Sequence, residues 1–534
     1  MENNNFAAMI EPFKSFADAI YISFKDRRVS VPRTVKSTPA FNSWIERNSS
    51  VGIQFEVVVE EMQVISALRE QSGENTVVGK DAAGDGTNAS EAIAMIEEAA
   101  YYRASDIHIL VRGSHADVQV TVNGDLRQFR EYRKEKCTEL IAAIWRGLVS
   151  TGDSQLIPNQ TQNAQITGEK LKSDTFVTSV RIVRGPMYPT SNGGQFMVLR
   201  LQYVNSDSRE RRQDLPPLRL PRAPEGEFLL PKLGFTELNI SRLKKLMAMP
   251  DGILIITGPT GSGKSTTDYE LRKEEARVRP YLKQIQVADP IEFPESWSTQ
   301  IPVTNALDHQ ATAKKFGEAF AAALRMAPRI IAPGEIRTPE VAMIAFEAAT
   351  TGHKVPTTLH VSDAFLWPDR LELMDPSRIN RRMFCDHKIV RGVVAQRLMR
   401  ILCLGCSKLV SDYPDSVESD IMDNLKTWAH DGDVSKVRVL GDGCEKCHYE
   451  GVTGRFGIME VVISDSKLMH DFVKHGSSVA RRNYHERADV DPPLLETAIK
   501  HVLSGEVDPY LVGETVDGIV SKEQFHEVYD GLNM

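Results

Sequence analysis

Long hydrophobic runs are missing from this sequence of 534 residues, and so is an N-terminal export signal. The strongest apolar run, Ile253–Ile256, has the size of a buried strand, whereas a membrane-spanning helix needs about 20 apolar residues. The opening residues, MENNNFAAMIEPF, contain no basic region followed by an apolar stretch. The sequence therefore predicts a cytoplasmic protein that reaches a membrane only through partners.

A strongly basic composition is missing as well. Lysine and arginine total 64 against 72 acidic residues, which gives a net charge of −8. Proteins that track nucleic acid combine basic and aromatic residues along their path. A dense basic run, Arg209–Arg212, contains Glu210 and lies in a segment rich in proline and charge. We therefore expect no nucleic-acid partner, and a nucleic-acid motor stays the alternative from a different class.

Cysteine is scarce, with six residues, but four of the six form two C-x-x-C pairs. Four thiolates in this spacing suit tetrahedral Zn²⁺ with no open coordination position, and a reducing compartment disfavours disulfides. The alternatives are a redox pair or free thiols. His448 follows the last cysteine, and we expect it at the surface because four ligands are already present. The predicted zinc ligands are Cys403, Cys406, Cys444 and Cys447.

A chain of this length exceeds what one hydrophobic core supports, so several domains are expected. Two segments have the composition of linkers: 71–90 is rich in Gly, Asn, Asp and Ser, and 205–228 is dense in proline and charge. These linkers leave three predicted domains, at residues 1–70, 91–204 and 229–534.

The patterns within these domains differ. The middle domain mixes a helical pattern over 90–103 with strands, and Asn123-Gly124 between two strands indicates a hairpin, so we expect an α+β fold. From Ile253 onward strands and helices alternate, which indicates a largely parallel sheet. The predicted fold class is therefore α/β with smaller N-terminal domains.

A phosphate-binding motif follows the strand Ile253–Thr257 and precedes a helix-forming stretch. It has the form GxxxxGK[ST], in which glycines turn backbone N–H groups toward phosphate oxygens. Lys264 is expected to reach the β- and γ-phosphates of ATP, and the Ser265 hydroxyl to bind Mg²⁺. The predicted nucleotide-binding residues are Gly258, Pro259, Thr260, Gly261, Ser262, Gly263, Lys264, Ser265 and Thr266.

Phosphoryl transfer also needs carboxylates that orient water and the metal, and cations for the transferred charge. Candidate groups stand at the ends of predicted strands downstream of the loop. They are Asp289 and Glu292 in ADPIEF, Glu335 in PGEIRT, and the pair His353 and His360 in TGHKVPTTLH.

Together these features resemble one family, the ATPases of type II secretion and type IV pilus assembly. The Asp box, Walker B segment and His box of that family are similar to residues 288–293, 333–338 and 351–360 here. The resemblance extends to ASDIHI (104–109), QRL (396–398) and GRFGI (454–458). It implies a RecA-like ATPase domain preceded by a PAS-like α+β domain and a small additional N-terminal domain.

The resemblance also implies roles for individual residues. Glu292 becomes the base that activates water and Glu335 the residue that organises Mg²⁺, although the two roles are interchangeable at this stage. His360 belongs to the His box of the catalytic site. Arg181 and Arg200 match arginines that reach the γ-phosphate bound by a neighbouring subunit.

Some positions depart from the family pattern. Thr338 replaces the aspartate of GEIRD, and Ala321 replaces a family arginine. Arg325–Arg329 stands where RQDPD is usual, and LIPNQTQNAQI (156–166) replaces RLPQDGR. A nucleotide-binding scaffold that does not hydrolyse ATP is the alternative that these departures raise.

The family resemblance predicts a cytoplasmic homohexamer that hydrolyses ATP and works at the inner membrane. Its expected partners are a membrane platform protein and the cytoplasmic accessory proteins of that platform. Because the extension and secretion members carry the tetracysteine element and retraction members generally lack it, we expect a type IV pilus extension motor. The short first domain favours the type IVb, bundle-forming-pilus-like branch. The type II secretion ATPase is the alternative. The segment 407–443 is expected to project as a knuckle toward the platform.

Overall fold

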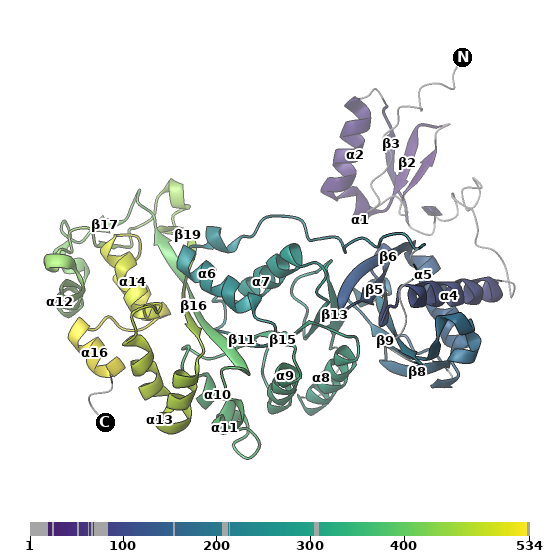
Figure 1. Ribbon diagram of the computed structural model, residues 1–534. Helices are drawn as coiled ribbons and strands as arrows, with labels where there is room; N and C mark the ends of the chain where they lie inside the picture. Colours follow the sequence, from purple (N-terminus) through teal and green to yellow (C-terminus); the bar gives the residue numbers. More distant parts are fainter. Residues whose placement is uncertain are drawn as a thin grey trace. The chain divides into compact units, whose positions relative to one another are not determined.

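The computed structural model describes residues 20–530, except 24–25, 51–52, 62–63, 66–67, 69–83, 153–154, 205–211, 213 and 304–308. The chain divides into two compact units, Met1–Ser90 and Glu91–Met534 (Figure 1). Most of the predicted linker 71–90 lies outside the described residues, but its last part is helical, because α4 already begins at Gly84.

The first unit is a small sheet covered by a helix. Its three strands run in the order β1-β2-β3, with β1 and β2 antiparallel and β2 and β3 parallel. Phe41 and Trp44 of the helix α2 are buried together with Val29 and Val31 of β2. The elements are β1 (Tyr21–Ser23), β2 (Arg28–Val31), α1 (Arg33–Lys36), α2 (Pro39–Ser50) and β3 (Glu56–Val59).

The second unit begins with an α+β domain built on a seven-stranded antiparallel sheet. The predicted hairpin is present, since Asn123 and Gly124 both have positive φ, 54° and 84°, between β5 and β6. The helices are α4 (Gly84–Tyr101), α5 (Lys134–Ala143) and the π-helix η3 (Ile144–Leu148). In sheet order the strands are β6 (Asp125–Arg133), β5 (His115–Val122), β4 (Asp106–Val111), β10 (Gln195–Tyr203), β9 (Val177–Pro186), β8 (Gln162–Thr167) and β7 (Thr151–Gly152).

The two faces of this sheet belong to different cores. Alternate residues such as Ile107, Ile109 and Leu199 pack with α4 and α5. On the opposite face, Leu110 and Val198 join the core of the following ATPase domain. Because side chains alternate along a strand, one run of apolar residues serves both cores.

Of the predicted linker 205–228, the structure describes residue 212 and residues 214–228. Near Arg219 this segment lies beside β6, the edge strand of the sheet. Gln128 N donates to Arg219 O over 2.9 Å, and the Tyr102 hydroxyl donates to Pro216 O over 2.7 Å. Leu215 and Leu218 are partly buried against the same core. These contacts fix residues 215–219 to the α+β domain, whereas Glu227 and Phe228 at the end of the segment contact the ATPase domain.

The ATPase domain has a seven-stranded sheet in the order β13-β12-β14-β15-β11-β16-β19, parallel except for β19. Its strands are β11 (Gly252–Thr257), β12 (Gln284–Ala288), β13 (Ser298–Pro302), β14 (Ile330–Pro333), β15 (Lys354–Leu359), β16 (Val390–Leu402) and β19 (Val452–Ile463).

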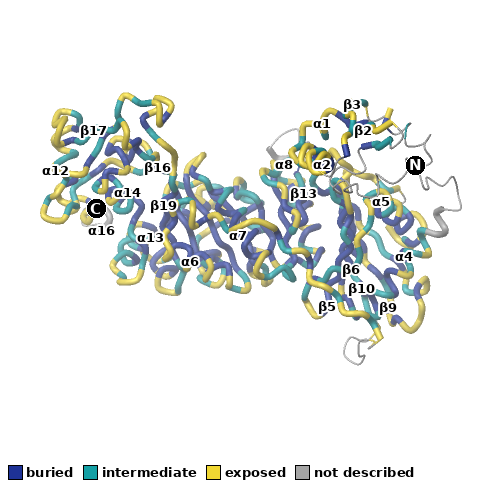
Figure 2. The backbone as a smooth tube through the Cα atoms, turned by 90° about the horizontal axis from the view of Figure 1, so that it is seen from above, coloured by how far each residue is buried: buried dark blue, intermediate teal, exposed yellow. Residues whose placement is uncertain are grey.

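Helices cover both faces of this sheet, as expected for a parallel sheet. Figure 1 shows α6 and α7 on one side and α8 and α9 on the other. Figure 2 shows buried backbone through the middle of the ATPase domain and exposed backbone mainly at its periphery. The helices are α6 (Glu237–Ala248), α7 (Lys264–Val278), α8 (His309–Leu324) and α9 (Pro339–Thr350).

The remaining elements pack at the β16–β19 side. The segment 407–443 contains α12, which contacts α14 and α16, and the rings of Trp428 and Phe525 lie 5.2 Å apart. This expected knuckle is therefore anchored on the C-terminal helices. The elements are α10 (Trp367–Met374), α11 (Arg381–Phe384), β17 (Lys408–Leu409), α12 (Ser419–Trp428), β18 (Arg438–Val439), α13 (Ser466–His485), α14 (Leu494–Leu503), α15 (Pro509–Thr515) and α16 (Lys522–Asp530).

None of the helices in the described part of the chain has both the length and the apolar character that a membrane span requires.

Candidate nucleotide site and cysteine cluster

The predicted catalytic segments meet at one edge of the ATPase sheet. The phosphate loop follows β11, the Asp-box segment follows β12, the Walker B segment follows β14 and the His box ends after β15. These four strands are parallel and adjacent in the sheet, so their carboxyl ends lie side by side. Ligands of open α/β sheets bind at this edge.

The phosphate loop is shaped by glycines and braced from β16. Gly261 and Gly263 have φ values of 78° and 85°, and α7 begins at Lys264 directly after the second. The amide of Gln396 accepts the Thr267 hydroxyl at 2.7 Å and donates to Ser262 O at 2.8 Å. A Cβ at Gly263 would stand 2.8 Å from Gln396 Nε2 and would displace this amide, and the φ of 85° also favours glycine.

Lys264 lies inside the loop. Its ammonium group donates to the carbonyls of Gly258 and Pro259, each over 2.9 Å. Burial lowers the pKa of Lys264 and Arg397 adds to this effect, while the carboxylates of Glu335 and Glu292 oppose it. The carboxylates of both predicted catalytic glutamates therefore lie close enough to Lys264 to affect its pKa.

Glu335 is held at the end of β14 by its neighbours on β15. Its backbone pairs with Thr358, and Ile336 N donates to Thr358 O over 3.0 Å. The carboxylate lies 3.1 Å from His360 Nε2 and accepts from Arg337 Nε over 2.8 Å. Burial lowers the pKa of His360, and Lys264 contributes to this while Glu335 opposes it.

A cavity of about 280 Å³ joins the predicted groups. Ser265, Glu292 and Glu335 all line it, together with Asp289 and Arg337. His353 lies away from this edge, since it precedes β15 and its Nδ1 contacts Ala348 O at 3.0 Å near the end of α9. Of the two histidines singled out in the sequence, only His360 contacts Glu335.

Arg181 and Arg200 stand directly opposite each other on β9 and β10. Arg200 Nε donates to the buried carboxylate of Asp106 over 2.8 Å, and the arginine side chain is 40% exposed. Arg181 is exposed and forms no ion pair within the part of the chain that the structure describes. Neither arginine is among the residues that line the cavity.

Two departures from the family pattern have structural explanations. Thr338 is the N-cap of α9, where its hydroxyl accepts from Val341 N, so it fills a position that aspartate also suits. Arg325 Nη1 donates to Asn163 Oδ1 over 3.3 Å, which joins the segment 325–329 to the replaced segment 156–166. The two altered segments therefore contact each other.

Sequence reasoning assigned no role to several residues around the cavity. Gln396 braces the phosphate loop, Arg337 pairs with Glu335, and Asp268 and Arg272 of α7 line the cavity. The signal for the last two was a run of charged residues in the helix after Ser265, in a position that a parallel sheet buries.

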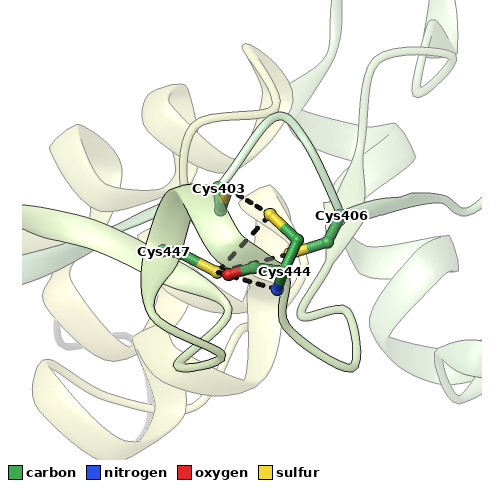
Figure 3. A group of neighbouring side chains, drawn as sticks. All are labelled: Cys403, Cys406, Cys444 and Cys447. Carbon is green, nitrogen blue, oxygen red and sulfur yellow. Dashed lines mark hydrogen bonds between the residues drawn. The ribbon is translucent and has the colours of Figure 1, made fainter.

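The four cysteines of the C-x-x-C pairs form one cluster at the end of β16. Their sulfurs all lie within 4.8 Å of one another and point to a common centre (Figure 3). The Sγ atoms of Cys403 and Cys444 are 3.7 Å apart, and those of Cys406 and Cys447 are 3.8 Å apart. Tetrahedral coordination with Zn–S bonds of about 2.3 Å separates sulfurs by about 3.8 Å, so the donor set fits zinc and excludes disulfides.

Backbone groups stabilise a thiolate in the cluster. The N–H groups of Cys444 and Gly451 donate to the sulfur of Cys447 over 3.2 Å and 3.3 Å. Desolvation raises the pKa of this thiol, but these two donors together with hydrogen bonds to the thiols of Cys406 and Cys444 lower the pKa to about 6. His448 is exposed and does not belong to the cluster, as predicted.

A phosphate loop at the end of a central parallel strand, with carboxylates at the ends of neighbouring strands, defines a P-loop ATPase. Comparison with known proteins gives the family. The profile of the type II/IV secretion system protein family matches residues 217–527, and this chain belongs to that family. It is an ATP-hydrolysing enzyme of the secretion and pilus type.

Two relatives illustrate the relationship. The type II secretion system protein E of Dickeya dadantii is 31% identical over 419 residues, which cover 77% of this chain and 73% of that protein. The type IV pilus assembly ATPase PilB of Thermus thermophilus is 30% identical over 415 residues, covering 77% of this chain and 41% of that protein. A crystal structure of the pilus retraction motor PilT with bound ADP matches with 21% identity and a TM-score of 0.38, covering 79% of this chain and 96% of that one.

Proposed function

We propose that the chain is a homohexameric motor that hydrolyses ATP to drive type IV pilus assembly at the inner membrane. The observation that carries the proposal is the clustered set of four cysteines in a chain of this family. In the family that the sequence resembles, this element accompanies extension and secretion and is generally missing from retraction motors. The cluster therefore favours assembly of a fibre over its disassembly.

The chemistry follows from the cavity at the strand ends. Backbone N–H groups of the phosphate loop and Lys264 would hold the phosphates of ATP, and Ser265 would bind Mg²⁺, which neutralises charge on the phosphates. Lys264 would then exchange the carbonyls of Gly258 and Pro259 for phosphate oxygens. Glu292 is proposed to accept the proton of the attacking water, and Glu335, held by Arg337 and His360, to orient the metal's water shell.

The arginines are proposed to act between subunits. Arg200, fixed by Asp106, and Arg181, which is exposed, form a pair of cations on adjacent strands outside the cavity of their own chain. In a ring they would stabilise charge on the phosphoryl group transferred in the neighbouring subunit.

The proposed partners are a platform protein of the inner membrane and its cytoplasmic accessory proteins. The motor would be cytoplasmic and would associate with the membrane through them, with no nucleic-acid partner. Zinc is the proposed metal of the cysteine cluster, where it would fix the fold rather than take part in hydrolysis. A type II secretion motor is the second candidate, favoured by the relative in Dickeya dadantii.

The experiment that separates the candidates is deletion of the gene in the source bacterium. Complementation would use the intact chain or the Lys264→Ala variant, with surface pili counted by electron microscopy and exported proteins measured in the medium. Loss of pili with normal export, restored only by the intact chain, is the expected result. Loss of export with normal pili would establish the secretion candidate, and no change in either would contradict the motor role.

The ring can be tested separately. Native mass spectrometry of the purified chain with a non-hydrolysable ATP analogue should give a six-chain species. A purely monomeric protein under these conditions would contradict the hexamer.

A further inference from the structure

The loop that carries Glu292 has no regular secondary structure of its own. It joins the end of β12 at Ala288 to the start of β13 at Ser298. A catalytic carboxylate in such a loop has to be held within a fraction of an ångström, because a displacement of about 1 Å can cost about 10²-fold in rate. The contacts that hold this loop therefore decide where Glu292 stands relative to the phosphates.

Several of those contacts come from one face of α7. Ser265, Asp268, Tyr269 and Arg272 follow one another at helical spacing, so they lie on the same side of the helix. Ser265, Asp268 and Arg272 line the same cavity as Glu292. The helix that begins at the phosphate loop thus also presents the groups that face the loop of Glu292.

Arg272 forms a buried bridge from this helix to the loop. Its Nε donates to Asp268 Oδ2 over 2.9 Å, and its Nη1 lies 2.6 Å from the carboxylate of Glu295. The side chains of Arg272 and Glu295 are 2% and 0% exposed. A charge pair so far from water is held much more firmly than a surface pair, because its partners cannot be replaced by solvent.

Further contacts fix the same part of the loop. Gln300 accepts from Glu295 N over 2.9 Å and donates to Phe293 O over 2.8 Å. The ring of Tyr269 lies 4.9 Å from that of Phe293 and 5.4 Å from that of Trp297. Phe293 and Glu295, one and three positions after Glu292, are therefore both held in place.

The α+β domain reaches the same point. Arg112, in the turn between β4 and β5, donates through Nη1 to the backbone oxygens of Glu295 and Ser298, over 3.4 Å and 3.3 Å. Glu295 is thus contacted from α7 through its side chain and from the preceding domain through its backbone.

We propose that Arg272 and Glu295 are a positioning pair for the known reaction, which sets the distance between Glu292 and the phosphate loop. The inference rests on the proposed role of Glu292. The pair acts through that glutamate. Because Arg272 lies on the same helix as Lys264 and Ser265, its contact with Glu295 fixes the loop of Glu292 relative to the phosphate loop. Neither residue is assigned a proton transfer.

The test is a set of substitutions in the full chain, measured by steady-state phosphate release and by binding of a fluorescent ATP analogue. Glu295→Gln keeps the size of the side chain and removes its charge. It should lower kcat by about 10-fold or more and change KM and the Kd of the analogue by less than about 2-fold. Glu274→Gln, which removes the charge of a pair with the half-exposed Arg277 on the same helix, is the matched control and should leave kcat unchanged.

A double-mutant cycle with Glu292→Gln distinguishes positioning from general damage. If Glu295 acts only through Glu292, adding Glu295→Gln to Glu292→Gln should cause no further loss of rate. The same fold-loss in both backgrounds, or weaker binding of the analogue with unchanged kcat, would overturn the proposal. Glu295→Asp, which keeps the charge but withdraws the carboxylate, should show the same selective loss of kcat if Glu295→Gln does not fold.

The failure of this inference differs from the failure of the proposed role. A fully active Glu295→Gln beside an inactive Glu292→Gln would overturn only the positioning pair. A fully active Glu292→Gln would overturn both.

Discussion

The nucleotide cavity and the cysteine cluster lie in the same domain but are held in opposite ways. At the nucleotide site two charged groups already have protein partners: Lys264 contacts loop carbonyls, and Glu335 contacts Arg337 and His360. In the cluster four sulfurs lie within 4.8 Å of one another, and the sulfur of Cys447 is contacted by two backbone N–H groups and by neighbouring thiols.

The difference shows what each site requires of its ligand. A site with internal partners keeps its shape when the ligand leaves, as a motor that releases its product must. Four crowded thiols need a divalent cation to offset their charge once ionised, so the metal becomes part of the fold. The cavity should accordingly tolerate changes that abolish chemistry, and the cluster should not tolerate loss of a ligand.

The largest expected effect falls on turnover in the cavity. Glu292→Gln and Glu335→Gln should each lower turnover by about 10²-fold or more, because each removes a carboxylate charge without emptying space. Binding of a fluorescent ATP analogue and the melting temperature should stay close to those of the intact chain. Normal hydrolysis by either variant would show that this glutamate has been given the wrong role.

The cysteine cluster should give the reverse result. Purified reduced protein should contain about one zinc per chain by metal analysis, and Cys403→Ser should lose the metal and lower the melting temperature by about 5 °C or more. Phosphate release per folded chain should change less than stability does. Freshly prepared protein without zinc would contradict the assignment of the cysteine cluster as a structural zinc site.

A smaller effect is expected from the arginines, and it shows whether the cavity is complete within one chain. Arg181→Ala or Arg200→Ala should lower turnover by less than the glutamate substitutions do, and by less than the roughly 10³-fold loss of a sole arginine finger, because each site is proposed to receive two arginines. Binding of ATP should persist. Mixing Lys264→Ala chains with Arg181→Ala chains should restore some activity, since a mixed ring pairs an intact loop with an intact neighbouring arginine. Confirmed mixed rings with no gain would contradict action between subunits.

The smallest effect concerns Thr338 at the rim of the cavity. Thr338→Ala should cost about 1 kcal/mol of unfolding free energy, since it removes the N-cap of α9. Thr338→Asp restores a capping oxygen and should match the intact chain in both stability and turnover. A large gain in turnover for Thr338→Asp would mean that this departure from the family limits catalysis.

The sequence was informative where chemistry needs a fixed spacing. The phosphate loop, the four cysteines and the Asn123-Gly124 hairpin were predicted from local patterns, because each depends on residues a few positions apart. The meeting of Ser265, Glu292 and Glu335 in one cavity followed from the parallel sheet, whose strand ends coincide.

Contacts between residues far apart in the sequence could not be predicted from the sequence. Gln396 lies 129 positions from its partner Thr267, and nothing in the local pattern of β16 marks it as a brace for the loop. The buried charges of α7 were also hidden, because a charged helix in isolation indicates a solvated surface. Ion pairs that the sequence does not reveal explain how this helix can be buried, among them Arg272 with Asp268 and Glu295, and Glu275 with Lys354.

The measurement that tests the account most directly is steady-state phosphate release by the purified full chain with ATP and Mg²⁺, beside Lys264→Ala. The account predicts hydrolysis by the intact chain, which stops when Mg²⁺ is chelated, and only background release by the variant, with the same circular dichroism spectrum for both. Turnover by Lys264→Ala equal to that of the intact chain would contradict the assignment of the phosphate loop as the catalytic site.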